Sequence, residues 1–190
     1  MLILARHGRT AANASGLLQG RVDNPLDAVG LRQAQDIAGA LGRPARLVAS
    51  PLLRARQTAD AFGLPVEIDE RWIELDYGTW DERPVRDVPA ETWAQWRADD
   101  SFALPGGESL ASLQLRVGEA IESLSEEARD HDVVVLTHVS PIKAAIGWAL
   151  GVGAATSWRM NVSQASITRL RTGKPGPAML SFNEVWHLGN

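Results

Sequence analysis

Val133-Val134-Val135-Leu136 decides the fold of this chain, because four consecutive aliphatic residues are typical of a strand that is buried on both faces of a parallel sheet. Shorter apolar runs at residues 2–5, 46–50 and 66–68 predict three further strands. We therefore expect a sheet whose strands are covered by helices on both sides.

Segments with helical spacing separate the predicted strands. Apolar residues recur at intervals of three and four within 31–41 and within 109–129, which indicates amphipathic helices. The Ser-Pro pairs at 50–51 and 140–141 have the residue types that cap and begin a helix. Helices are predicted over residues 31–41, 50–62, 91–98, 109–129 and 140–150.

The last third of the chain is expected to add edge strands. Residues 159–171 and 178–183 alternate loosely between apolar and polar types, and the last strand is expected to run antiparallel to its neighbour. Residues 9–27 and 72–89 predict irregular connections. Strands that alternate with helices predict an α/β fold: a three-layer α/β/α sandwich around a mostly parallel sheet with an antiparallel edge strand. The length predicts a single domain over residues 1–190.

Composition limits the classes of function. The chain has no cysteine, which excludes a disulfide framework, a thiol nucleophile and a thiolate metal site. A formal net charge of −4 argues against a broad nucleic-acid-binding surface. The longest apolar stretch, 144–155, is too short to span a bilayer, and no targeting segment is apparent. We expect a cytoplasmic protein without nucleic-acid or membrane partners.

The basic and metal-ligating residues have an uneven distribution. Only Lys143 and Lys174 of the 19 basic residues are lysines, so most cations are planar arginine forks that suit phosphate and carboxylate. The four histidines lie at 7, 131, 138 and 187, without the spacing of a metal site. No metal and no other cofactor is expected.

Two histidines follow predicted strands and should meet at one edge of the sheet. His7 comes after strand 2–5, between Arg6 and Gly8, and His138 comes after strand 133–136. Ligands of such sheets bind outside the carboxyl ends of the strands. A lone histidine at a strand end is more often a packed residue. Arg6 would disfavour its protonation, however, and a neutral imidazole can act as a nucleophile or base.

Two further clusters carry groups that could take part in chemistry. Arg54 and Arg56 fall in the first turn of the 50–62 helix, where the helix dipole disfavours cations unless an anion is bound there. Two solvated arginines are the alternative. Glu74 lies on a loop dense in tryptophan and acidic residues, where it could transfer protons or pair with an arginine. Several aromatic residues could shape an outer pocket or cover the core: Trp72, Trp80, Trp93, Trp96 and Phe102.

Together these clusters resemble the histidine phosphatase superfamily, which includes cofactor-dependent phosphoglycerate mutases and several phosphatases. The similarity covers essentially the whole chain. Six blocks occur in the family's order: residues 6–10, 19–26, 50–55, 74–78, 106–109 and 137–138.

The resemblance implies a role for each residue of the candidate site. His7 would be the nucleophile that becomes a phosphohistidine, and Glu74 would protonate the leaving oxygen and then deprotonate the attacking water. Arg6, Arg54 and a protonated His138 would bind the phosphoryl oxygens without a metal ion. The phosphate-binding set would be extended by Thr10, Asn13, Val139, Gln19 and Gly20.

Departures from the family pattern favour a phosphomonoesterase. Mutases usually carry a longer insertion between the acidic loop and the second histidine, whereas 74–138 is compact here. Mutases also tend to have Glu-Ser where this chain has Arg9 and Thr10. Members of the family commonly have small residues, often two glycines, after the second histidine, where this chain has Val139 and Ser140. A phosphoglycerate mutase and a catalytically silent phosphate-binding module remain the alternatives. The expected partner is a small phosphorylated metabolite, and edge strands could pair in a homodimer.

Overall fold

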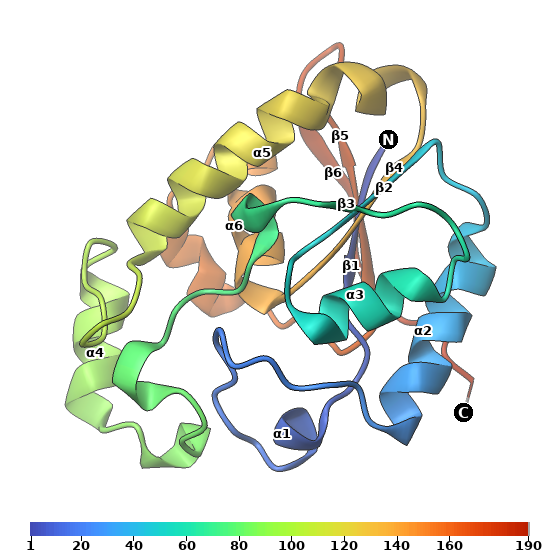
Figure 1. Cartoon of the computed structure of the whole chain (residues 1–190). Helices are drawn as coiled ribbons and strands as arrows, with labels where there is room; N and C mark the ends of the chain where they lie inside the picture. The colour runs from blue at the N-terminus through green and yellow to red at the C-terminus, as the bar shows by residue number, and fades with distance from the viewer. Residues whose placement is uncertain (190) are drawn as a thin grey trace.

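Strand β4 (Val133–Thr137) lies inside a six-stranded sheet, between β1 and β2 (Figure 1). The computed structural model describes residues 1–189. The strand order is β3-β2-β4-β1-β5-β6. The other strands are β1 (Leu2–Arg6), β2 (Arg46–Ala49), β3 (Glu67–Ile68), β5 (Ile167–Arg171) and β6 (Ala178–Glu184). The first four strands in this order run parallel, and β5 runs antiparallel to both of its neighbours.

Helices cover both faces of the sheet, which confirms the predicted α/β sandwich. Figure 1 shows α2 and α3 on one side and α5 and α6 on the other, with α1 and α4 beyond the carboxyl ends of the parallel strands. Their bounds are α1 (Ala11–Ala14), α2 (Ala28–Leu41), α3 (Leu53–Asp60), α4 (Ala90–Ala98), α5 (Leu110–Asp130) and α6 (Val139–Leu150). Within residues 1–189, no helix is both long and apolar enough to cross a membrane.

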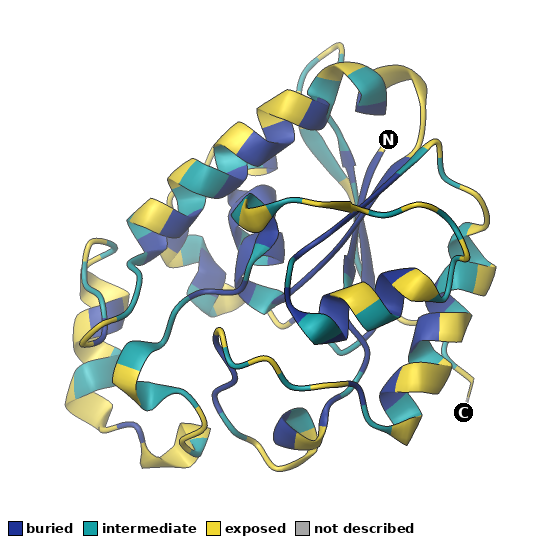
Figure 2. Ribbon diagram, in the orientation of Figure 1, coloured by how far each residue is buried: buried dark blue, intermediate teal, exposed yellow. Residues whose placement is uncertain are grey.

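Alternating side chains of the central strands feed two separate apolar layers. Leu2 and Leu4 of β1 belong to the cluster under α5 and α6, whereas Ile3 and Ala5 belong to the cluster on the opposite face. The strands are accordingly buried along their length (Figure 2). A one-residue slip would exchange the two sets, so packing fixes the register that places Arg6 opposite Thr137. His7 and His138 therefore leave the sheet side by side.

The predicted start of the third helix is wrong by three residues. Helix α3 begins at Leu53, preceded by Leu52, and Ser50 does not cap it. The Ser50 hydroxyl instead lies 2.7 Å from His138 Nε2, and it accepts a hydrogen bond from the Leu52 backbone N–H. The Ser50 side chain, which the local pattern assigned to the helix cap, thus contacts His138 across the sheet edge instead. Helix α6 also begins earlier than predicted, at Val139 rather than Ser140.

The carboxyl-terminal strands and the loops differ in part from prediction. The structure assigns no strand at 159–166, and β5, which begins at Ile167, lies between β1 and β6 rather than at an edge. Of these two strands only β6 lies at an edge of the sheet, and it is antiparallel to β5 as predicted. The connection at 9–27 contains the one-turn helix α1, capped by Thr10, and short 3₁₀ turns interrupt 72–89.

Candidate active site

His7 lies directly beyond β1, and its ring has a defined tautomer. Its backbone N–H donates to the Thr137 carbonyl at 2.9 Å, which continues the β1–β4 pairing by one residue. The Nδ1 atom lies 2.7 Å from the Gly8 carbonyl, which can only accept, so Nδ1 carries the proton. Nε2 is left with a free lone pair, and this is the atom available for nucleophilic attack.

The surroundings of His7 favour the neutral ring. The side chain is almost fully buried, and burial together with Arg54 and Arg6 holds the pKa of His7 well below its usual value. Gly8 is needed next to it for packing, since a Cβ there would lie 2.4 Å from the Gly30 carbonyl oxygen of α2. Gly8 thus allows the backbone to lie close against a helix of the chain itself.

His138 lies behind His7, with ring centroids 5.1 Å apart. It is the residue directly before α6 and is fully buried. Its Nε2 contacts the Ser50 hydroxyl. Nδ1 has no hydrogen-bond partner among residues 1–189. Burial and Arg54 hold the pKa of His138 well below its usual value, which disfavours the protonated form that the resemblance implied. A bound phosphate dianion would oppose both effects.

Two buried guanidinium groups flank the histidines. Arg6 Nη1 donates to the Val162 carbonyl at 2.6 Å, and Arg54 donates to the carbonyls of Val22 and Gly20 at 2.7 Å each. Burial lowers the pKa of Arg54 to about 10, so it stays charged at neutral pH. These backbone contacts fix the planes of two cations that lack a carboxylate partner within 4 Å in the described part of the chain. By contrast, Arg56 is exposed, in agreement with the alternative of a solvated arginine.

Glu74 reaches the same region from the loop after β3. One carboxylate oxygen, Oε1, accepts from the backbone N–H groups of Leu75 at 2.7 Å and Ser140 at 3.1 Å, the second of which lies in the first turn of α6. The side chain is buried and makes no arginine pair among residues 1–189, so the alternative of a Glu74 ion pair is not realised there. With Oε1 held in place, Oε2 is the oxygen left for proton transfer.

The cavity that these groups surround has a volume of about 160 Å³, and we call it the phosphate cavity. It is lined by Arg6, His7, Asn13, Leu17, Leu18, Gln19, Gly20, Arg54, Glu74, Tyr77 and Val139. Most residues predicted for the site therefore line this one cavity. Thr10 and His138 are the two that do not line it, since both lie fully buried behind it.

Thr10 acts on its neighbours instead. Its hydroxyl accepts from the Asn13 backbone N–H at 3.1 Å, and its own backbone N–H donates to Asn13 Oδ1 at 3.2 Å. The side-chain amide of Gln19 is oriented so that its nitrogen donates to the Thr10 hydroxyl. Its oxygen then accepts a hydrogen bond from Arg54 Nε at 2.9 Å. Gly20 adopts a φ of 36°, and a Cβ there would collide with the Asp81 carboxylate. These residues hold Asn13 and Arg54 at the cavity.

The sequence patterns missed several lining residues. The phosphate cavity is also lined by Tyr77, Leu17 and Leu18, none of which was predicted as a site residue. Of the three, only Tyr77 lies within one of the six blocks that resemble the family. Of the tryptophans, Trp72 is fully buried in the core. In the part of the chain that the structure describes, no three His, Asp or Glu side chains gather as a metal site would require.

Comparisons with known proteins agree with the geometry. A sequence model of the histidine phosphatase superfamily (branch 1) matches residues 2–185. Phosphoserine phosphatase 1 of Hydrogenobacter thermophilus is 32% identical, covering 99% of this chain and 94% of the relative. A probable phosphoglycerate mutase of Yersinia enterocolitica is 32% identical over 89% of this chain and 83% of its own length. A crystal structure of phosphoserine phosphatase from Entamoeba histolytica superposes with a TM-score of 0.91 at 26% identity, covering 98% of both chains.

Other relatives are longer proteins. A bifunctional protein of Mycobacterium tuberculosis is 34% identical over 88% of this chain. The chain spans about half the length of that relative, since the match covers 49% of it.

Proposed function

Because this chain belongs to the histidine phosphatase superfamily, we propose that it is a phosphomonoesterase that hydrolyses a small phosphorylated metabolite through a phosphohistidine on His7. The observation that carries the proposal is the His7 tautomer. Nδ1 donates to the Gly8 carbonyl, so the Nε2 lone pair is free in a cavity lined by Arg6, Arg54 and Glu74. A buried neutral imidazole next to two fixed cations is suited to attack on a phosphate dianion.

The first half-reaction transfers the phosphoryl group to the protein. The His7 Nε2 lone pair forms a bond to phosphorus while the bond to the ester oxygen breaks. Protonated Glu74 gives its proton to that leaving oxygen, and the alcohol departs. Arg6 and Arg54 stabilise the charge on the equatorial oxygens, which is the main task of a protein in phosphoryl transfer.

The second half-reaction regenerates His7. The Glu74 carboxylate takes a proton from water, the water oxygen bonds to phosphorus, and the bond to Nε2 breaks to release phosphate. Glu74 is protonated again at the end. His138 is a positioning residue in this scheme. It lies behind His7 without lining the cavity, and the bound dianion favours its protonated form.

A phosphoglycerate mutase is the second candidate, and the Yersinia relative named as a probable mutase favours it. A mutase would pass the phosphoryl group from His7 to a hydroxyl of a second substrate rather than to water. A silent phosphate-binding module would bind the anion and transfer nothing.

One experiment separates these outcomes. The protein is incubated with phosphoserine and with 3-phosphoglycerate, and phosphate release, isomerisation and acid-labile phosphate on the protein are measured. We expect phosphate release and a phosphoprotein that His7→Ala abolishes, while His131→Ala, at an exposed histidine, leaves both in place. Isomerisation without phosphate release would establish the mutase instead, and binding without phosphoprotein would establish the silent module.

The remaining parts of the proposal concern its setting. Residues 1–190 form a single catalytic domain that works in the cytoplasm without a metal ion, and the edge strand β6 pairs two copies in a homodimer. Analytical ultracentrifugation and activity in the presence of a chelator test the last two points.

A further inference from the structure

A second cavity adjoins the phosphate cavity. It has a volume of about 170 Å³, and Leu18, Tyr77 and Val139 line both cavities. Its other walls include Trp93, Trp96, Trp158 and Lys143, and we call it the aromatic pocket. Since the two cavities share three lining residues, the part of an ester that follows the phosphate can extend into the aromatic pocket.

The walls of this pocket are flat and mutually packed. Trp93 and Trp96 stack at 5.6 Å with an interplanar angle of 13°, and Trp158 meets both edge-on at 5.9 and 5.4 Å. Tyr77 adds an edge contact to Trp96 at 5.8 Å. A cavity of roughly 150 Å³ accepts a benzene ring. The aromatic pocket therefore has the size and the surfaces for one ring of a ligand.

Three residues that line the pocket carry hydrogen-bond donors without a partner among residues 1–189. The indole N–H groups of Trp96 and Trp158 are unpartnered, but their nitrogens have almost no accessible surface. The Lys143 ammonium makes no hydrogen bond and no ion pair within the same described range, and its side chain is only partly buried. Burial lowers the pKa of Lys143, although nearby Glu74 acts in the opposite direction. Among the described residues, no acidic side chain lines the pocket. Lys143 is therefore the cationic donor that a ligand in the pocket can reach.

Lys143 stands one helical turn beyond Val139 on α6. Residues four apart on a helix are neighbours on one face, about 5–6 Å between Cβ atoms. Val139 lines the phosphate cavity, and Lys143 lines only the aromatic pocket. An anionic group bound by Lys143 would thus lie across one ring from the ester oxygen.

We propose that the aromatic pocket binds the alcohol portion of the substrate, and that this alcohol carries a ring and a carboxylate, which Lys143 binds. The inference rests on the proposed function, because the ester must place its phosphate at His7. A single carboxylate matches the single ammonium in charge, and it can accept a charge-assisted hydrogen bond from that ammonium. Lys143 is then a specificity-determining residue rather than a catalytic one.

A pair of matched esters tests the carboxylate. We would measure kcat/KM for 3-carboxyphenyl phosphate and for 3-carbamoylphenyl phosphate, which has nearly the same shape without the charge. The unaltered protein should prefer the carboxylate by about 10-fold or more, as expected of a hydrogen bond to a charged group. Lys143→Met should bring this ratio close to one, and Lys143→Arg should restore most of it. Comparison of ratios between proteins cancels the difference in leaving-group chemistry.

Lys174→Met is the control, because Lys174 is the other lysine of the chain and is exposed. It should keep the full preference for the carboxylate. An equal ratio in the unaltered protein and in Lys143→Met would overturn the inference, and so would an unaltered protein that shows no preference. If neither ester were hydrolysed and no phosphate appeared on His7, the proposed function itself would fail.

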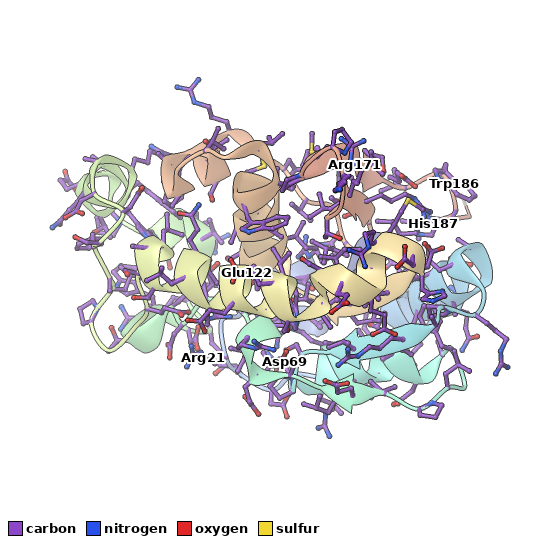
Figure 3. All side chains as sticks on the ribbon, turned by 90° about the horizontal axis from the view of Figure 1, so that it is seen from above. Arg21, Asp69, Glu122, Arg171, Trp186 and His187 are labelled. Carbon is purple, nitrogen blue, oxygen red and sulfur yellow. The ribbon has the colours of Figure 1, made fainter. Side chains whose placement is uncertain are left out.

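A second pair of esters tests the ring. Trp158→Ala should lower kcat/KM for phenyl phosphate at least ~10-fold more than for methyl phosphate, because it removes an aromatic wall of the pocket. The control is Trp186→Ala, since Trp186 is 70% exposed and lies at the opposite end of the molecule from α4 (Figure 3). Equal losses on the two esters would show that Trp158 does not select for a ring.

Discussion

The phosphate cavity and the aromatic pocket adjoin each other but are built in different ways. The phosphate cavity holds charged groups at the ends of strands and helices, and each is fixed by backbone contacts, as Arg54 is by the carbonyls of Gly20 and Val22. The aromatic pocket is made mainly of indole rings from α4 and from residue 158, held by contacts with one another. The first is suited to one constant chemical group. The second is suited to select among alcohols.

This difference separates two kinds of mutational effect. A change in the phosphate cavity should lower the rate for every phosphate ester, because every ester presents the same group there. The size of the loss can depend on the acidity of the leaving alcohol, but it should not depend on the shape of that alcohol. A change in the aromatic pocket should alter the ratio between esters of similar acidity but different shape. A phosphate-cavity variant that selects among alcohols by shape would break this comparison.

The largest effect is expected from Glu74→Gln. The amide cannot donate a proton to a departing alkoxide, so alkyl phosphates should be hydrolysed about 10²–10⁴-fold more slowly. An aryl phosphate with an acidic phenol should lose much less. Steady-state rates on serine phosphate and on 4-nitrophenyl phosphate would show this. Glu122→Gln, at an exposed carboxylate on α5 that Figure 3 labels, is the control. Equal losses on both esters would make Glu74 a structural residue.

Arg54→Met should be next. The loss of one preorganised donor to developing charge costs about 10²–10³ in rate, and here it should apply to all esters alike. Arg56→Met, two residues further along α3 and exposed, should stay near the unaltered rate. Removal of the Arg54 guanidinium leaves two backbone carbonyls without their donor, so thermal unfolding of both variants should be measured to show that Arg54→Met is folded. Arg54→Lys is a smaller change that keeps the positive charge. Similar rates in the Arg54 and Arg56 variants would show that Arg54 does not stabilise the transferred phosphoryl group.

The sequence predicts the phosphate cavity far better than the aromatic pocket, for a physical reason. Strand periodicity locates the carboxyl end of β1 and of β4, and the parallel pairing of Arg6 with Thr137 then brings His7 to His138. No such rule applies to the aromatic pocket. Trp158 lies on a 3₁₀ turn just before the segment that was predicted as an edge strand, and Lys143, in an apolar helix, was not assigned to the site. Their proximity arises only from tertiary packing.

Ser50 shows the same limit on a smaller scale. Its neighbour Pro51 and the helix that follows made it a natural cap, and local hydrogen bonding would have been enough for that role. The contact to His138 depends on the neighbouring strand β4, which lies more than 80 residues further along the chain. A pattern within ten residues carries no information about it.

Gly8→Ala should test how tightly the phosphate cavity is packed. The added Cβ would lie 2.4 Å from the Gly30 carbonyl oxygen, and backbone on both sides must move. We expect a loss of roughly 1–3 kcal/mol in the free energy of unfolding, as for other overpacked sites, together with a displaced His7. Gly39→Ala in α2 is the matched control, since nothing lies within 4 Å of its added Cβ, and it should leave stability unchanged or raise it. Urea unfolding measures both.

The smallest effect concerns pH. Burial keeps the pKa of His7 and of His138 below the value that each has in the unfolded chain, so protons bind the unfolded state more readily. The contribution to stability is complete above about pH 6.5 and is lost as the pH falls toward the folded-state pKa. Between pH 6.5 and 5.5, each histidine should cost up to about 1 kcal/mol, because the unfolded imidazole goes from half protonated to almost fully protonated. Urea midpoints at these two pH values should differ less for His138→Gln than for the unaltered protein, whereas the exposed His131→Gln should keep the full difference. An undiminished difference in His138→Gln would show that His138 does not contribute to the acid sensitivity.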